Sequence, residues 1–506
     1  MNNTQPQRLV VCLGAMATLS ACTLGPSYHR TAVEAPPAYT ELGSTPDSRT
    51  PPADAELAAW WQQFNDPLLT DLIQRALASN LDLQTAVSRV RAARLQEVVA
   101  RAGEYPSVSA DADAITFNKK SAPPAASGAD SSDFTLPSHL NLFAAALDAS
   151  WEIDLFGGTR RAVEAARANS EAALWARRDG EVTLVAEVAN DYLTLRMLQT
   201  RIAIGNAELA RQKSLYELVA ARRQAGFVTR LDVNQQGTVV ETAAAQIPQL
   251  EQQAKVQTHA IGVLLGELPE TLATELESSP ASIPPPPPGL PPGLPSELLQ
   301  RRPDLREAER RVAAANAQIG VAQAARFPKL NLIGLASFAS TSADELFSSR
   351  SFATAGVGMA SAPLFDAGKL RASVDVAKEQ ELQATLAYRT AVLGAFRDVE
   401  DALARYHAED TRRQALARSV DAAQNSLTIA QDQYQTGFVA FINVLQAENT
   451  LSNAQDQLTQ SDAQVLTDLV ALYKALGGGW SPSEGGAPKS VTNEAPAANN
   501  PAPPPQ

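Results

Sequence analysis

The chain has 506 residues, of which 45% are hydrophobic and 6% aromatic, and its formal net charge at pH 7 is -13. This acidic balance argues against a nucleic-acid partner, because phosphate binding needs clustered Lys and Arg, and an acidic wall suits the passage of cations. Few aromatic residues and long stretches rich in Ala, Gln, Leu and Arg favour helices over a sandwich or an α/β enzyme.

The first 22 residues have the pattern of a bacterial export signal. Arg8 precedes an apolar run from Leu9 to Leu19, which is far shorter than the ~20 apolar residues of a spanning helix. The small residues before Cys22 are similar to a lipobox, so we expect Cys22 to become the lipidated first residue of the mature chain. An ordinary signal peptide with an incidental cysteine is the alternative. Thr23 follows, where Asp would signal inner-membrane retention, which favours delivery to the outer membrane.

Strands are the predicted membrane-crossing elements. No other apolar run of ~20 residues occurs, so a crossing helix is not expected. The predicted strands, each about the length of a tilted transmembrane strand, are the segments around 106–117, 140–156, 328–339 and 352–365. In the second, an apolar face alternates with an acidic one at period two: Leu147, Ala149, Trp151, Ile153 and Leu155 alternate with Asp148, Ser150, Glu152 and Asp154. In the first, Val108, Ala110, Ala112 and Ala114 alternate with Ser109, Asp111 and Asp113.

The chain is an internal duplication. Residues 224–228 match residues 435–439 at an offset of 211, and Leu155-Phe156 matches Leu364-Phe365 at an offset of 209. Tyr105-Pro106 matches Phe327-Pro328 at an offset of 222, which places the length difference in the longer loop of the first copy, Asn118 to His139. Each copy therefore reads helix, two short strands, one very long helix, a Gly-marked turn and a second helix.

Long paired helices follow the strands in both copies. No proline occurs between Thr159 and Ala225 or between Lys369 and Thr436, so each predicted helix would reach roughly 100 Å. The helices after the turns carry matching heptad rows, namely Val233, Gln236, Val240, Ala243, Ile247, Leu250 and Ala254, and Val444, Ala447, Leu451, Ala454, Leu458, Ser461 and Val465. A plain coiled coil is the alternative, but it does not explain two acidic-faced strand pairs.

Closure of the sheet requires other chains. Four strands leave two open edges, and an open edge cannot face lipid because its backbone groups have no partners there. The strand hairpins and the helix turns lie at opposite ends of the long helices. Gly226 and Gly437 therefore mark the tip far from the membrane.

Motifs in a fixed order along most of the mature chain carry a family resemblance. They are Cys22 with Gly25-Pro26-Ser27-Tyr28, Trp60-Trp61, Asp66-Pro67-Leu68, Asn80-Leu81-Asp82-Leu83, residues 151–157, Arg301-Arg302-Pro303-Asp304-Leu305, Phe327-Pro328 and Tyr434 with Gly437. The chain resembles the outer-membrane factor family of TolC-, OprM- and NodT-like efflux lipoproteins.

This resemblance implies a mainly α fold with a membrane β-barrel. Three chains would form a twelve-stranded barrel, continued by a long periplasmic α-helical coiled-coil barrel. The homotrimer would be an outer-membrane duct that passively conducts small molecules from an inner-membrane pump and a periplasmic adaptor protein. The adaptor would dock on the tip turns at Gly226, Phe227, Gly437 and Phe438.

The resemblance also implies a gate near the periplasmic tip, and here the sequence departs from the family. Asn443 and Gln446 are neutral where relatives often carry Asp. Asp232 is retained, Tyr434 could donate its hydroxyl to it, and Val439 replaces an Arg of some relatives. We expect a constriction lined by Ile442, Asn443 and Gln446 that is less acidic than usual; solvated polar positions are the alternative.

The predicted domain limits follow the duplication. They are a signal peptide at 1–21, a lipidated extended segment at 22–58, the first repeat at 59–270, a Pro-rich linker at 271–295, the second repeat at 296–478 and a disordered tail at 479–506. The four histidines are isolated, and no catalytic motif is present. We therefore expect no enzyme activity, no metal and no cofactor beyond the lipid on Cys22. Alternative functions are the exit duct of an ATP-driven protein or metabolite exporter and a structural coiled-coil lipoprotein.

Overall fold

The computed structural model describes residues 23–30, 35–41, 54–118, 139–278, 282–287 and 295–481. The signal segment, Cys22 and most of the predicted tail lie outside the described residues. The chain divides into two compact units. Unit 1 comprises residues 1–39, 79–180 and 295–400, and unit 2 comprises residues 40–78, 181–294 and 401–506. Each unit draws on both predicted repeats.

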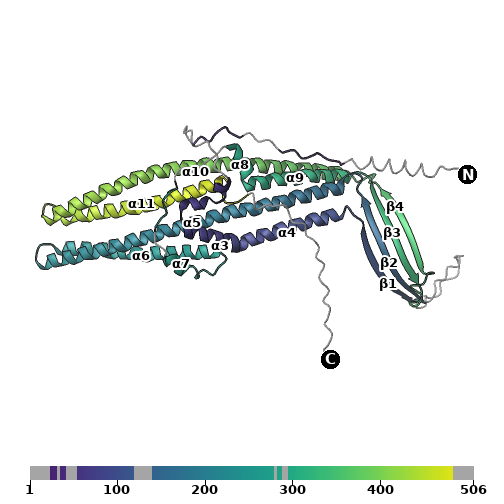
Figure 1. Ribbon diagram of the computed structural model, residues 1–506, viewed down its shortest axis with the longest axis horizontal. Coiled ribbons are helices and arrows are strands. Elements are labelled where there is room, and N and C mark those ends of the chain that lie inside the picture. Colours follow the sequence, from purple (N-terminus) through teal and green to yellow (C-terminus); the bar gives the residue numbers. More distant parts are fainter. Residues whose placement is uncertain are drawn as a thin grey trace, which may run out of the picture. The chain divides into compact units, whose positions relative to one another are not determined.

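The order of elements matches the predicted duplication (Figure 1). The short elements are α2 (Asp54–Ala58), η2 (Trp60–Phe64), α3 (Pro67–Ser79), α7 (Ala273–Ser278) and α8 (Pro295–Arg301). The first copy then has α4 (Leu81–Ala102), β1 (Ser107–Asn118), β2 (His139–Ile153), α5 (Gly158–Gln224) and α6 (Arg230–Leu264). The second has α9 (Pro303–Ala324), β3 (Lys329–Ser340), β4 (Phe352–Ser361), α10 (Lys369–Gln435) and α11 (Phe441–Ala475).

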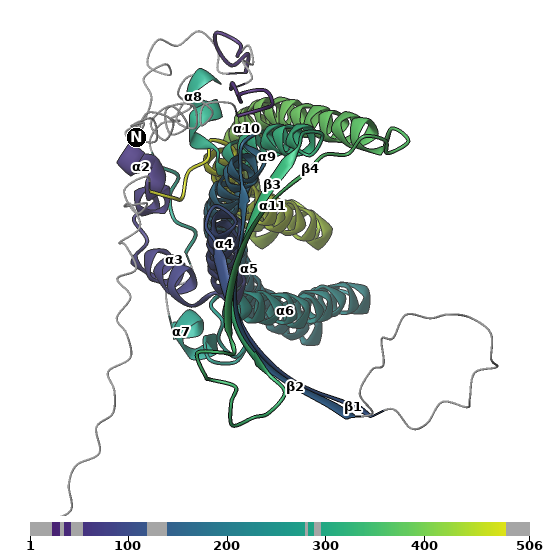
Figure 2. The ribbon, with the colours of Figure 1, turned by 90° about the vertical axis from the view of Figure 1, so that its right-hand side faces the viewer.

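Unit 1 contains a curved antiparallel sheet with the strand order β1-β2-β3-β4 (Figure 2). β1 pairs with β2, with Ser107 opposite Ser150, and β3 pairs with β4, with Lys329 opposite Ser361. Each repeat therefore forms one antiparallel hairpin. Phe143 pairs with Ser340 where β2 meets β3, so the two repeats are joined edge to edge. β1 and β4 are left as the edge strands.

Two strands end earlier than the sequence predicts. β2 stops at Ile153 rather than near 156, because the Asp154 carboxylate accepts the Arg160 backbone N–H at 3.0 Å and starts the turn into α5. β4 stops at Ser361 rather than near 365. Pro363 follows, and it has no N–H to donate to a ladder.

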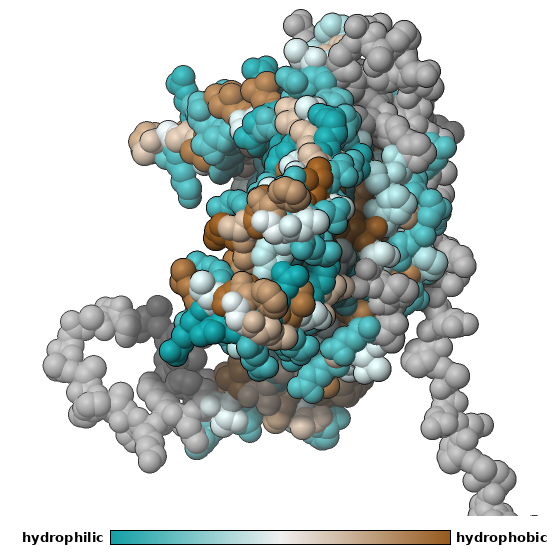
Figure 3. Space-filling view, turned by 90° about the vertical axis from the view of Figure 1, so that its left-hand side faces the viewer, coloured by the Kyte–Doolittle hydropathy of each residue, from teal (hydrophilic) through white to brown (hydrophobic). Residues whose placement is uncertain are grey.

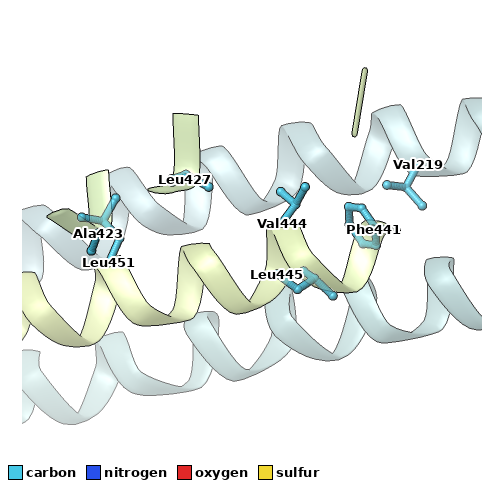
Figure 4. Packing of buried hydrophobic residues seen from close by; sticks show 7 residues of the cluster. All are labelled: Val219, Ala423, Leu427, Phe441, Val444, Leu445 and Leu451. Atoms are coloured by element: carbon cyan, nitrogen blue, oxygen red, sulfur yellow. The ribbon is translucent and has the colours of Figure 1, made fainter. Parts of the chain in front are cut away.

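Unit 2 is held by the predicted heptad rows. Every member of both rows is buried or half-buried, so the 3,4 spacing does place them inward. Near the turns, Figure 4 shows Phe441, Val444 and Leu445 of α11 beside Val219, Ala423 and Leu427. Farther from the turns, Trp60 stacks on Tyr473 with ring centroids 5.0 Å apart.

Helix starts follow local capping chemistry. The Asp66 carboxylate accepts the backbone N–H groups of Leu68 and Leu69 at 3.0 and 3.1 Å, which caps α3 directly before Pro67. Asn80 caps α4 by accepting the Leu83 N–H at 2.8 Å. Pro303 occupies the first turn of α9. Among the described helices, none is both long and apolar enough to cross a membrane.

Candidate functional site

The sheet of unit 1 has the predicted apolar and acidic faces in its first hairpin. Ala110 lies opposite Leu147 and Val108 opposite Ala149, so the apolar positions share one face. Ser109 lies opposite Asp148 on the other face and donates its hydroxyl to that carboxylate at 2.6 Å. Side chains on one face of a sheet recur every second residue, so Asp111, Asp113 and Glu152 also belong to the acidic face.

The acidic face does not continue across the second hairpin. Asp148 lies opposite Leu335 and Ser150 opposite Ile333, while the corresponding positions of β4 include Val357 and Met359. The negative charges of this face are therefore concentrated on β1 and β2. Lys329 at the start of β3 forms an ion pair of 3.0 Å with Glu152.

The segment that follows Cys22 is fixed beside the end of β2 in unit 1. The Leu24 N–H donates to the Phe156 carbonyl at 3.2 Å, and the Arg161 guanidinium donates to the carbonyls of Leu24 and Gly25 at 3.0 and 3.1 Å. A Cβ on Gly157 would lie 2.7 Å from the Thr23 side chain. The position next to Cys22 is thus held at a strand-to-helix junction.

The two tip turns of unit 2 share one backbone geometry. Phe227 N donates to Arg222 O at 2.9 Å, and Phe438 N donates to Gln433 O at 2.8 Å. Gly226 and Gly437 have φ of +83° and +80°, which is the Schellman ending that favours glycine. Phe227 and Phe438 are 81% and 82% exposed. Figure 3 shows apolar residues projecting among polar ones at this end.

The predicted hydrogen bond between Tyr434 and Asp232 is wrong. Asp232 instead closes a capping box: its carboxylate accepts the backbone N–H and the hydroxyl of Thr229, both at 2.7 Å, and its own N–H donates to that hydroxyl. The Tyr434 hydroxyl is buried and has no hydrogen-bond partner among the described residues. The Arg222 guanidinium lies 4.9 Å from the Tyr434 ring centroid.

The other gate candidates lie together on α11. Ile442 is 43% exposed, and Asn443 and Gln446 are also exposed. Positions three and four residues apart share one face of a helix. The structure therefore gathers Ile442, Asn443 and Gln446 one turn from the tip, on the side away from buried Val444 and Leu445.

A buried polar cluster in unit 2 was missed by the sequence reasoning. The Gln236 amide donates to Gln212 Oε1 at 2.6 Å, and the Gln212 amide donates to a carboxylate oxygen of Glu448 at 2.9 Å. Burial raises the pKa of Glu448; Glu208 raises it further, whereas the hydrogen bond from Gln212 and the charge of Arg211 lower it. The sequence signal that could have revealed this cluster is Gln236, a polar residue inside the mostly apolar heptad row. The cluster borders a polar groove of about 570 Å³ that also contacts Arg201.

In the described part of the chain, no group of His, Cys, Asp and Glu side chains is arranged to hold a metal ion.

Comparisons with known proteins agree along nearly the whole chain. The model of a family described as outer membrane efflux protein matches residues 72–267 and 294–478. The chain is 35% identical to the pyoverdine export outer membrane protein OpmQ of Pseudomonas aeruginosa over 470 residues, which cover 92% of this chain and 96% of OpmQ. It is 34% identical to the antibiotic efflux pump outer membrane protein ArpC of Pseudomonas putida, over 94% of this chain and 97% of ArpC. The solved outer-membrane channel OprN superposes with a TM-score of 0.83 at 34% identity, over 91% of this chain and 100% of that chain.

Proposed function

The chain belongs to the outer membrane efflux protein family, and from this membership we propose that it is the passive exit duct of a tripartite efflux system. It is an efflux channel component of the outer membrane. In the proposed system, an inner-membrane pump selects small molecules and a periplasmic adaptor connects the pump to this duct. Relatives named for pyoverdine export and antibiotic efflux support small organic substrates. The chain supplies a path rather than bond chemistry, so no catalytic role is assigned.

The duct is proposed to be a homotrimer. The supporting observation is the four-stranded sheet, whose edge strands β1 and β4 come from the two different repeats. Backbone groups along such edges need partners inside a lipid bilayer. Three copies give twelve strands, enough for a barrel with a wet lumen. The charged face of β1 and β2 is assigned to that lumen and the apolar face to lipid.

Cys22 is the proposed lipidation site. The fixed position of Thr23, against Gly157 between β2 and α5, supports this assignment because it would bring an acyl group close to the strands. Lipid and strands then anchor the chain at the same membrane surface. Globomycin, which blocks lipoprotein signal cleavage, should leave a longer precursor, whereas Cys22→Ser would remove radiolabelled palmitate. Palmitate retained by Cys22→Ser would contradict the assignment.

The tip turns are the proposed adaptor-docking surface. Phe227 and Phe438 project at two turns of matching geometry, and exposed aromatic residues are enriched at protein interfaces. The variant Phe227→Ser/Phe438→Ser should fold and reach the outer membrane but fail to capture the adaptor encoded beside the pump. Phe347→Ser, which also alters a highly exposed phenylalanine but lies between β3 and β4, is the matched control.

Substrate accumulation in a deletion strain tests the proposed function. Cells lacking the chain should accumulate several compounds of a drug and dye panel by several-fold, and the wild-type gene should restore efflux. The tip variant should not restore it, whereas the Phe347→Ser control should. Unchanged accumulation over the panel, together with loss of a secreted protein, would instead support an exit duct for an ATP-driven exporter.

A further inference from the structure

Within one chain, the two repeats meet at a stacked aromatic pair. Phe156 and Phe327 have ring centroids 4.8 Å apart and an interplanar angle of 28°. Phe156 lies three residues beyond Ile153, and Phe327 lies three residues before Leu330, which are the last paired residues of the β2–β3 ladder. The stacked pair therefore sits in line with that ladder, just outside the sheet. It marks how one repeat joins the next.

The repeat counterparts of this pair have no such contact within the described part of the chain. Phe365 follows β4 as Phe156 follows β2, and Tyr105 precedes β1 as Phe327 precedes β3. Phe365 is 90% exposed and Tyr105 is 64% exposed. The turn after Phe365 is ordered, because the Asp366 carboxylate accepts the N–H groups of Gly368 and Leu370 at 2.9 and 2.8 Å. Two aromatic side chains are thus exposed at the ends of the two edge strands.

We propose that β4 of one chain pairs with β1 of the partner subunit in a β4–β1 seam. At the end of this seam next to the helices, Phe365 of one chain stacks on Tyr105 of the partner subunit. This inference rests on the proposed trimeric duct and specifies its register. Applying the repeat offsets to the observed β2–β3 pairing places Ser361 opposite the partner's Ser109 and Phe352 opposite the partner's Asn118. Phe352 is the first residue of β4 and Asn118 is the last of β1. The two strands therefore end together at the other end of the seam, away from the helices.

The faces of the sheet support the same register. It sets Ala360 opposite the partner's Ala110 and Gly358 opposite the partner's Ala112. Within the chain, Ala360 shares a face with Leu330, and Ala110 shares a face with Leu147, so both members of each pair belong to the apolar face. A shift by one residue would turn one strand's apolar positions onto the acidic face. The inferred seam keeps the apolar face continuous across the subunit boundary.

Cysteine cross-linking in the full-length protein tests the seam. Tyr105→Cys/Phe365→Cys, treated with a short bismaleimide in isolated outer membranes, should give a covalent trimer on a denaturing gel, because every chain is linked to both neighbours. Phe156→Cys/Phe327→Cys, the within-chain template, should remain at monomer size. Tyr105→Cys/Val357→Cys is the register control, since Val357 lies inside β4, eight residues before Phe365. The single-cysteine variants control for native thiols.

The outcomes of these experiments distinguish a failure of the proposed seam from a failure of the proposed trimer. A covalent trimer from Tyr105→Cys/Phe365→Cys but not from the register control supports the seam. Native mass spectrometry that reports a trimer, combined with cross-linking only in the register control or in neither variant, would overturn the seam and leave the trimer standing. A monomeric protein would overturn the proposed assembly and the seam together. Phe365→Tyr should keep the trimer's resistance to heat dissociation, and Phe365→Ala should reduce it.

Discussion

At the scale of single residues, Glu448 is a half-buried carboxylate whose charge the fold disfavours. Burial raises its pKa, Glu208 adds to the effect, and Gln212 and Arg211 offset part of it. Because the pKa of Glu448 in the folded state lies above that in the unfolded state, the contribution of this carboxyl group to the stability of the fold is present at low pH. It is lost as the pH rises through the raised pKa.

Replacement of this carboxylate gives a pH-dependent prediction. Glu448→Gln should raise the melting temperature at pH 8 by on the order of 1–3 °C, and the gain should vanish near pH 4, where the wild-type carboxyl group is protonated. Differential scanning fluorimetry across this range measures the effect. Glu217→Gln, at an exposed position of α5, controls for the loss of one charge. An equal gain at both pH values would contradict the explanation by burial.

Gln446 tests the proposed gate. Gln446→Asp should place a negative charge at an exposed position next to the tip and increase the cation preference of the open channel, because an acidic ring attracts cations. Reversal potentials in a salt gradient measure this preference. Asn449→Asp, one turn farther from the tip and also exposed, is the matched control and should change the preference less. An unchanged reversal potential and unchanged opening for Gln446→Asp would remove Gln446 from the gate.

At the scale of elements, much of the fold could be predicted from the sequence. The long helices end within a residue or two of the predicted limits, because no proline interrupts them and Gly226 and Gly437 supply the left-handed turns. The strand ends were less predictable. They depend on the carboxylate of Asp154 and on the missing N–H of Pro363. Both residues lie just beyond the last strand residue, so the alternation of apolar and polar residues does not reveal their effect.

The predicted site was only partly recoverable for a similar reason. The positions of Ile442, Asn443 and Gln446 follow from helical periodicity, so the shared face of α11 could be inferred. The hydrogen-bond partner of Asp232 could not be inferred from the sequence, because the nearby Thr229 competes for the same carboxylate. The contact of Arg222 with Tyr434 joins distant segments and leaves no pattern in the sequence.

Pro248 lies inside α6 without ending it. An interior proline cannot donate the helical hydrogen bond and costs about 3 kcal/mol relative to alanine. Its repeat counterpart is Thr459, whose hydroxyl donates to the Gln455 carbonyl at 2.9 Å. Pro248→Ala should therefore raise the melting temperature of the purified protein by a few degrees, measured by calorimetry. Gln249→Ala, at the adjacent exposed position, should change it by less; a lower melting temperature for Pro248→Ala would show that the proline is required.

At the scale of the whole molecule, the internal duplication underlies the proposed assembly. Each repeat contributes one hairpin and one long helix pair, and β2–β3 pairing joins the repeats within the chain. The same join, repeated between chains, would close the sheet. The acidic residues of β1 and β2 would then contribute three equivalent charged sectors to the lumen. This arrangement predicts a conducting, cation-preferring channel rather than a structural tether.

Single-channel recording tests whether the trimer is a cation-preferring channel. Purified trimers added to a planar lipid bilayer should produce discrete current steps, with cations carrying the larger share of the current. Asp111→Asn/Asp113→Asn should reduce that share, since these carboxylates belong to the charged face of β1. Trimers that insert into the bilayer and carry no current would contradict the account.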